Sequence, residues 1–402
     1  MSLQNTPSSE RPHIAFFGMR NAGKSSLVNA VTGQNLSIVS DKLGTTTDPV
    51  TKAMEILPLG PVVIIDTPGF DDQGDLGQLR VEKAKEVLRK TDVAILVADI
   101  TKGLQDWDHT LISLFKERSL PYIIVLNKAD LAHTSSSEAS LENALEVSSV
   151  TGTGVHELKE KIGHILEEND APKYIVRDLI SKNDLVVLVI PIDESAPKGR
   201  IILPQQLVLR ELLDANAAAL CVQDTELPAL LSSLSKKPAL VITDSQAFKK
   251  VSADTPEDIP LTSFSILLAR YKGFLEDAVN GTAALKTLSE GSRILIAEGC
   301  THHRQCNDIG TVKLPKLIKK VTGKDFIYET CSGREYPSDL TKYDFVLHCG
   351  GCMLNEKEML SRMKMAKDQG VPVSNYGITL AYLNGILKRS VEVFPGLAEK
   401  IE

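Results

Sequence analysis

Short apolar runs alternate with amphipathic stretches through residues 13–170. The runs HIAFFG, VVIIDTPG, VAILVADI and YIIVLNKAD are almost wholly apolar until they reach a polar turn. Such runs are typical of parallel strands that are buried on both faces. The stretches GKSSLVNAVTG and LRVEKAKEVLRK between them have helical spacing. Alternation of this kind predicts a doubly wound α/β sheet, the first part of an α/β protein.

Two further α/β patterns follow. LVVLVIPID and PALVITD enclose a long helical stretch, and RILIAEGC, DFIYETC, YDFVLHCGGC and VPVSNYG each read as a strand that runs into a turn. The charged stretch EENDAPKY (Glu167–Tyr174) is a plausible linker before them. We therefore predict three domains, at residues 13–172, 173–262 and 263–402, after a disordered N-terminus at 1–12. The middle domain has no visible chemistry, so we expect it to serve dimerisation.

Composition narrows the class of protein. The 402 residues are 43% hydrophobic and 24% charged, with a formal charge of −7, which argues against a general nucleic-acid binder. No apolar run reaches the roughly 18 residues needed to span a bilayer, and the polar N-terminus lacks the apolar core of a signal peptide. We therefore expect a cytoplasmic protein without membrane contact, whose 6 cysteines are ligands, reactive thiols or core residues rather than disulfides.

The stretch GMRNAGKSS (Gly18–Ser26) matches the phosphate-loop pattern G-x-x-x-x-G-K-[ST]. It follows the strand HIAFF and precedes a helical stretch, which is the context that this motif requires. Glycines let the backbone wrap phosphates, and the helix N-terminus favours anions. Lys24 is expected to neutralise the β- and γ-phosphates, and the Ser25 hydroxyl to ligate Mg²⁺.

Further motifs follow in the expected order. In DTPG, Asp66 is placed to hold Mg²⁺ through water, and Gly69 to offer its N–H to the γ-phosphate. In NKAD, the Asp130 carboxylate can accept two hydrogen bonds from guanine that adenine cannot supply, which predicts GTP rather than ATP. SSV (Ser148–Val150) is placed to contact the guanine carbonyl. The expected nucleotide contacts are Asn21, Ala22, Gly23, Lys24, Ser25, Ser26, Asp66, Gly69, Asn127, Lys128, Asp130, Ser148, Ser149 and Val150.

Together these motifs resemble the GTPase superfamily over about 160 residues, and GTTTD (Gly44–Asp48) is similar to the first switch of Era- and TrmE-like GTPases. The resemblance implies that Thr46 completes Mg²⁺ coordination beside Lys24, Asp66 and Gly69 in the catalytic group. It also implies that Asn21 ligates an activating K⁺, although an asparagine there also suits a left-handed turn. Phe70 replaces a catalytic glutamine, so slow intrinsic hydrolysis is expected.

Five cysteines fall near the C-terminus, among them Cys300 of the motif Cys-Thr-His and the pair in HCGGC, Cys349 and Cys352. Three of the predicted strands in this region end on cysteine, and ligands collect beyond the carboxyl ends of parallel strands. A two-residue gap lets both thiolates face one centre. The spacing alone leaves open an iron–sulfur cluster, a zinc site and a redox dithiol.

The pattern C-x-H, 45 residues, H-C-x-x-C behind a TrmE-like GTPase domain resembles the HydF family, the maturation GTPases of [FeFe]-hydrogenases. GRIILPQQ, DIGTVKLP and SNYG are similar to this family too. The resemblance implies a homodimer that binds GTP and a [4Fe-4S] cluster on Cys300, Cys349 and Cys352 with an exchangeable fourth position. It also implies a scaffold that works with the radical-SAM enzymes HydE and HydG and delivers a diiron precursor to the apo-hydrogenase HydA.

The fourth cluster position is left open by the sequence. His302 and His348 carry the motif histidines of the resembled family, and each is either a direct ligand or a donor to a thiolate. Cys306 and Cys331 lie outside the resembled pattern and are expected to be non-ligands. Cys221, in the apolar run AAALCVQ, is expected to be a core residue.

Two other functions remain as alternatives. The first is an RNA-modification or ribosome-assembly GTPase with a structural zinc domain, which the Era and TrmE likeness alone would suggest. The second is a GTP-gated thiol regulator that uses Cys349 and Cys352. The acidic charge and the lack of a basic patch interleaved with aromatic residues weigh against RNA.

Overall fold

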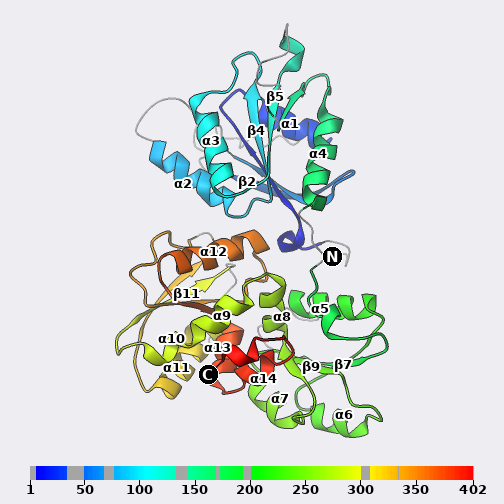
Figure 1. Ribbon diagram of the computed structural model, residues 1–402, viewed down its shortest axis with the longest axis vertical. Coiled ribbons are helices and arrows are strands. Elements are labelled where there is room, and N and C mark those ends of the chain that lie inside the picture. The colour runs from blue at the N-terminus through cyan, green and yellow to red at the C-terminus, as the bar shows by residue number, and fades with distance from the viewer. Residues whose placement is uncertain are drawn as a thin grey trace. The chain divides into compact units, whose positions relative to one another are not determined.

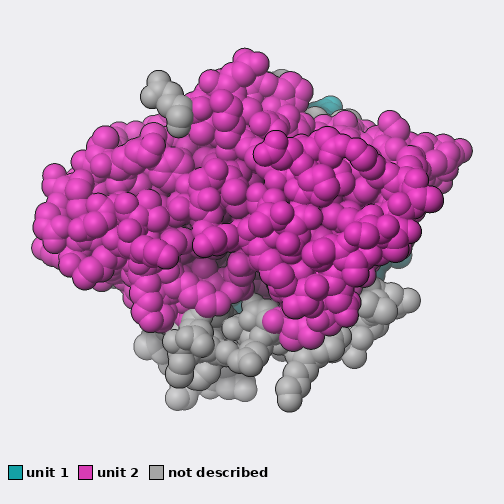
Figure 2. Space-filling model, turned by 90° about the horizontal axis from the view of Figure 1, so that it is seen from below, with its two compact units in different colours: residues 1–171 teal, residues 172–402 magenta. Residues whose placement is uncertain are grey.

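The computed structural model describes residues 6–33, 49–67, 77–132, 141, 143–168, 173–192, 201–299, 308–333 and 335–401. The chain divides into two compact units, residues 1–171 and 172–402 (Figures 1 and 2). Within the described ranges, no helix combines the length and the apolar character that a membrane span needs.

The first unit is built on a six-stranded sheet in the order β2-β3-β1-β4-β5-β6. Only β2 runs antiparallel to its neighbour, and the other pairs are parallel. The strands are β1 (His13–Phe17), β2 (Val50–Ile56), β3 (Gly60–Asp66), β4 (Val93–Asp99), β5 (Tyr122–Asn127) and β6 (Ala144–Val147), and the helices are α1 (Lys24–Thr32), α2 (Gly77–Leu88), α3 (Asp106–Glu117) and α4 (Val155–Glu168).

Helices cover both faces of this sheet (Figure 1). Side chains alternate along β1, so Ile14 and Phe16 pack with α1 and α4, while Ala15 and Phe17 pack with α2 and α3. This confirms the doubly wound sheet expected from the apolar runs. Strand β2 was not predicted, because its VTKAMEI sequence lies at the sheet edge and exposes most of its side chains.

The second unit contains two four-stranded sheets, and every strand pair in them is parallel. The first sheet has the order β10-β9-β7-β8 and consists of β7 (Leu185–Val189), β8 (Ala218–Val222), β9 (Leu240–Thr243) and β10 (Leu261–Ser263). The chain from β7 to the start of the other sheet also forms the helices α5 (Leu203–Asp214), α6 (Leu227–Ser233), α7 (Phe248–Asp254), α8 (Phe264–Tyr271), α9 (Leu275–Thr282) and α10 (Ala284–Thr287).

The other sheet has the order β12-β11-β13-β14 and carries the cysteine region. Its elements are β11 (Arg293–Glu298), α11 (Leu314–Thr322), β12 (Ile327–Ser332), β13 (Phe345–His348), α12 (Glu356–Asp368), β14 (Val373–Asn375), α13 (Tyr376–Leu383) and α14 (Leu387–Val391). One hydrophobic core, from Ile175 to Leu397, continues through both sheets. The boundary predicted after residue 262 lies inside β10.

The expectation for Cys221 was wrong. Its side chain is exposed, because β8 is the edge strand of its sheet and most of its side chains keep some contact with solvent. An apolar run can form an edge strand as readily as a buried one when the strand is short.

Candidate functional site

The phosphate loop joins β1 to the N-terminus of α1 and requires glycine at two places. Gly18 has φ 140°, and a Cβ there would meet the carbonyl oxygen of Val97 at 2.1 Å. Gly23 has φ 88°, and its Cβ would lie 2.2 Å from Nδ2 of Asn127. Both positions combine a left-handed backbone with close packing, so only glycine fits. The loop leads into the N-terminus of α1, an end of a helix that favours anions.

Lys24, at the start of α1, and Asp66, at the end of β3, are both buried beside the phosphate loop. Lys24 Nζ donates to the carbonyl oxygens of Gly18 at 2.9 Å and Met19 at 3.3 Å. Burial lowers the pKa of Lys24, against the opposing charge of Asp66. Burial also raises the pKa of Asp66, while Lys24 and a hydrogen bond from Ser25 oppose that shift. Ser25 and Asp66, two of the three residues expected to hold Mg²⁺, therefore lie in direct contact.

Asn127 connects the phosphate loop to the base-binding loop. Its buried Nδ2 donates to the Ala22 carbonyl at 2.9 Å, and its Oδ1 accepts from the N–H of Ser149 at 3.1 Å. Lys128 has a left-handed backbone (φ 66°), and its Nζ lies 2.6 Å from Asp99 Oδ2. These contacts place NKAD and SSV beside the phosphate loop.

The Asp130 carboxylate lies at the rim of this site. Its Oδ1 accepts a hydrogen bond from the Ser148 hydroxyl at 2.5 Å, and the side chain remains exposed. The Ser148 oxygen accepts in turn from the N–H of Thr151 at 3.1 Å. This chain of hydrogen bonds orients Asp130 toward solvent, where a guanine edge can approach it. Val150 is exposed nearby, as are Asn21 and Ser26 on the phosphate loop and helix α1.

Several predicted residues lie outside the described residues. They are Thr46 with its GTTTD motif, Gly69 and Phe70 of the second switch, and Cys300, His302 and Cys306 of the cysteine region. The contacts Lys128–Asp99 and Ser148–Asp130 were not predicted, because no sequence motif reports the partner of a loop side chain.

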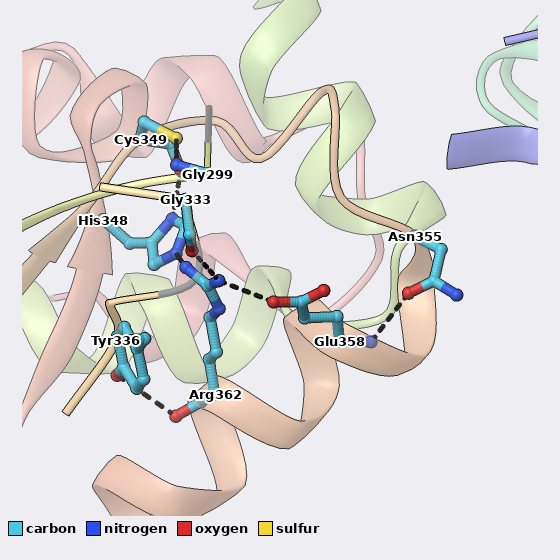
Figure 3. Close-up of polar contacts among 8 residues, drawn as sticks. All are labelled: Gly299, Gly333, Tyr336, His348, Cys349, Asn355, Glu358 and Arg362. Carbon is cyan, nitrogen blue, oxygen red and sulfur yellow. Dashed lines mark hydrogen bonds and ion pairs between the residues drawn. The ribbon is translucent and has the colours of Figure 1, made fainter. Parts of the chain in front are cut away.

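In the second unit, the cysteine loop begins where β13 ends. The Cys349 N–H donates to the Ala297 carbonyl at 2.8 Å, which ties the loop to β11. Two backbone N–H groups point at the Cys349 sulfur. The N–H of Gly299 lies at 3.1 Å (Figure 3), and that of Gly351 lies at 3.4 Å. Donors of this kind stabilise a thiolate and are typical around iron–sulfur ligands. Cys300 directly follows Gly299 in the chain but lies outside the described residues.

Glycine lets the loop fold closely over α12. Gly351 has φ 63°, and a Cβ there would lie 2.4 Å from the sulfur of Met359. A Cβ at Gly350 would meet nothing within 4 Å. The two adjacent glycines are therefore not equivalent, and only Gly351 is required by its surroundings.

His348 is fully buried, and both of its ring nitrogens have partners (Figure 3). Arg362 donates to Nε2 at 3.1 Å, so Nδ1 carries the proton and donates to the Cys349 carbonyl at 2.8 Å. Burial, aided by the Arg362 charge, lowers the His348 pKa to about 3. These bonds favour the supporting role for His348 over the direct ligand role that the sequence left open.

Arg362 is a buried side chain of α12 that the sequence did not single out. It also donates to the Gly333 carbonyl at 2.8 Å and pairs with Glu358 at 2.6 Å, while its guanidinium lies over the Tyr336 ring (Figure 3). An arginine in a helical pattern usually predicts a solvated position. Arg362 therefore fixes His348 in a way that only the fold reveals.

The remaining thiols differ in their surroundings. Cys331, on β12, is buried in the core, and burial raises its pKa to about 11. Burial also raises the pKa of Cys352. No three His, Cys, Asp or Glu side chains gather as a metal site among the described residues, which include Cys349 and Cys352 but not Cys300.

Three family models match the chain. Residues 175–273 match the hydrogen maturase F dimerization domain, and residues 276–393 match the hydrogen maturase F tetramerization domain. Together these two cover more than half of the chain. Residues 13–128 match the model described as 50S ribosome-binding GTPase.

Individual relatives and solved structures match part of the chain. GTPase Era of Caldicellulosiruptor saccharolyticus is 27% identical over 271 residues, which are 62% of this chain and 86% of that protein. The tRNA modification GTPase MnmE of Desulforamulus reducens is 33% identical over 158 residues, 38% of this chain and 34% of that protein. The crystal structure of a probable GTP-binding protein EngB is 22% identical with a TM-score of 0.32, and the match covers 39% of this chain and 100% of that one.

Proposed function

This chain belongs to the hydrogen maturase F family and is a hydrogenase maturation GTPase, and from this premise we propose that it is a scaffold and carrier for the diiron active-site precursor of [FeFe]-hydrogenase. In this proposal Cys300, Cys349 and Cys352 hold a [4Fe-4S] cluster whose fourth position is exchangeable. The observation that carries it is the pair of N–H groups directed at the Cys349 sulfur, on a loop at the carboxyl edge of a parallel sheet.

The described residues fit such a cluster. The two N–H donors to the Cys349 sulfur favour its thiolate form. Arg362 donates to Nε2 of His348, so this histidine supports the loop instead of filling the open position of the cluster. The cluster, when bound, supplies an iron with a replaceable ligand. The residues themselves orient the thiolate and keep His348 neutral and fixed.

In the GTPase site, the phosphate loop and Lys24 are expected to bind the β- and γ-phosphates, with Asn127 and Asp130 at the base. Lys24 at present donates to Gly18 and Met19, and these bonds have to give way to phosphate oxygens. Mg²⁺, held by Ser25 and Thr46 and through water by Asp66, neutralises phosphate charge when bound. The Ser25–Asp66 contact supports this assignment.

We assign a K⁺ site to Asn21, which would supply charge near the phosphates. The left-handed backbone of Asn21 (φ 63°) would by itself explain an asparagine. Asn21→Gly separates the two explanations, because glycine keeps this backbone and removes the amide oxygen. We expect the variant to bind GTP but to lose the faster hydrolysis in K⁺ over Na⁺. An unchanged K⁺ effect would remove this role.

We further propose a cytoplasmic homodimer formed through the dimerization domain. The support is β8, a partly exposed apolar edge strand within residues 175–273, because such an edge is ready to pair with another chain. Cys221→Glu on β8 is expected to lower the mass measured by light scattering toward that of a single 43.8 kDa chain. An oligomer that survives this charge would place the interface elsewhere.

The carrier function is tested by transfer of the diiron precursor from this chain to apo-hydrogenase. Chain loaded by the radical-SAM enzymes HydE and HydG, then purified and mixed with apo-hydrogenase HydA, is expected to produce hydrogen evolution. Cys349→Ala should abolish this activation, and Cys331→Ala should leave it intact because Cys331 is a core thiol. Activation by a Cys349→Ala protein would contradict the proposal. A protein that carries zinc alone would favour an RNA-directed GTPase with a structural zinc domain.

A further inference from the structure

Lys272 lies in the turn between α8 and α9, and only 1% of its surface is exposed to solvent. The turn is fixed by the backbone: Phe274 N–H donates to the Ala269 carbonyl at 3.0 Å, and Gly273 N–H donates to the Arg270 carbonyl at 2.9 Å. Gly273 has φ 75°, as this kind of helix ending requires. The geometry leaves the Lys272 side chain directed inward rather than toward solvent.

The ammonium group reaches the cysteine loop. Lys272 Nζ donates to the Gly351 carbonyl at 2.7 Å and to the Leu354 carbonyl at 2.5 Å, on either side of Cys352. The Gly351 carbonyl also accepts the N–H of Leu354 at 3.1 Å, which closes a turn around the cysteine. A buried ammonium is costly unless it is hydrogen-bonded, and these two carbonyls supply such bonds.

Both carbonyls belong to the loop that carries Cys352, so the positive charge of Lys272 lies next to this loop. Arg362, which is also buried, pairs with Glu358 at 2.6 Å and donates to Nε2 of His348 at 3.1 Å. Glu298, also buried, accepts a hydrogen bond from the Tyr376 hydroxyl at 3.3 Å.

We propose that Lys272 positions the cysteine loop and that its fixed positive charge raises the reduction potential of the cluster. The inference rests on the proposed function, in which Cys349 and Cys352 are cluster ligands. An oxidised cluster with three thiolates carries a net charge of about −1, and one electron from an external reductant makes it about −2. A buried cation stabilises the second state more than the first, since charges inside a protein are weakly screened.

Two substitutions at one position separate charge from hydrogen bonding. Lys272→Gln removes the charge but keeps an N–H₂ group that can donate to carbonyls, whereas Lys272→Met removes both. Lys324→Gln is the matched control. Lys324 also donates to a backbone carbonyl, that of Leu288 at 2.5 Å, but it precedes β12 and so lies at the opposite end of the parallel sheet from the cysteine loop.

The experiment is a dithionite titration of the reconstituted full chain followed by EPR. At a fixed potential we expect the ratio of reduced to oxidised cluster to fall at least about tenfold in Lys272→Gln and in Lys272→Met, a shift of about 59 mV to lower potential for a one-electron couple. Lys324→Gln should match the unchanged chain.

Three outcomes would overturn the inference. One is an unchanged potential in Lys272→Gln, which would assign Lys272 to hydrogen bonding alone. Another is an equal shift in Lys324→Gln. The third is failure of both Lys272 variants to assemble a cluster that Lys324→Gln assembles, which would make the role purely structural. Absence of a cluster from the unchanged chain would instead overturn the proposed function.

Discussion

At the scale of single residues, the two glycines between Cys349 and Cys352 offer a matched comparison. Gly351→Ala forces an alanine into a left-handed backbone, at a cost of about 1 kcal/mol, and drives its Cβ into Met359. Gly350→Ala meets no neighbour. We expect Gly351→Ala to retain less than about half of the iron bound after reconstitution and Gly350→Ala to retain nearly all. Equal iron contents would show that the loop geometry does not govern the site.

The base preference depends on one carboxylate. Asp130→Asn replaces an acceptor with a donor and reverses one hydrogen bond to guanine, so nucleotide preference is expected to move toward xanthine by at least about tenfold. Fluorescent GDP and XDP titrations measure this directly. Ser148→Ala, which removes only the hydroxyl that donates to Asp130, should weaken GDP binding without changing the preference. Retained guanine preference in Asp130→Asn would mean that another group reads the base.

Some of the functional residues could be predicted from the sequence, and others could not. The phosphate loop and NKAD are detectable because their chemistry needs particular residue types at particular spacings. Arg362 and Lys272 carry no such pattern, since a buried cation and a solvated one look the same in a sequence. Cys221 shows the reverse error, in which apolar neighbours predicted burial for an exposed side chain.

At the scale of elements, an ion pair connects the start of the second unit to α8. Arg270 binds Asp178, in the short helix Arg177–Leu179, through two hydrogen bonds, and this bonding lowers the Asp178 pKa against the effect of burial. A lowered folded-state pKa means that the stabilisation is present above the unfolded pKa of about 3.9 and is lost as the pH falls through the folded pKa.

Asp178→Asn is therefore expected to destabilise the second unit at pH 7 by no more than about 1 kcal/mol, because the pair is partly exposed. The difference from the unchanged chain should begin to shrink as the pH falls through about 3.9 and should disappear below the folded-state pKa of Asp178. Calorimetry of the metal-free chain measures it, with the second unit identified as the transition that added GDP does not shift. A difference that does not shrink as the pH falls below about 3.9 would contradict the charged pair.

The parallel strands were predictable, and the edge strands less so. The apolar runs of β1, β3, β4 and β5 are buried on both faces and read as strands by themselves. The antiparallel edge strand β2 and the short β6 have no comparable run. In the second unit, four predicted strands became β11 to β14, all parallel, and this brings Cys331 and Cys349 to the same edge of the sheet.

At the scale of the whole molecule, the family to which the chain belongs was identifiable from motifs alone, because a GTPase pattern and a cysteine pattern occur together in one sequence. The continuity of the second unit was not, since a hydrophobic core that crosses from one sheet to the next leaves no mark in the local pattern. At the end of α8, Lys272 donates to the Gly351 carbonyl of the cysteine loop, and Arg270 binds Asp178. The Lys272 bond therefore joins the region that matches the dimerization domain directly to the cysteine region.

One chain is proposed to combine a GTP site with a cysteine-held [4Fe-4S] cluster, and anaerobic reconstitution is a direct test of this combination. Metal and sulfide analysis with EPR of the dithionite-reduced chain should give about four iron and four sulfide per chain and a signal from the reduced cluster. Cys300→Ala, Cys349→Ala and Cys352→Ala should each abolish that signal, and Cys331→Ala should keep it. Zinc as the sole bound metal, or a cluster that survives the loss of Cys349, would contradict the account.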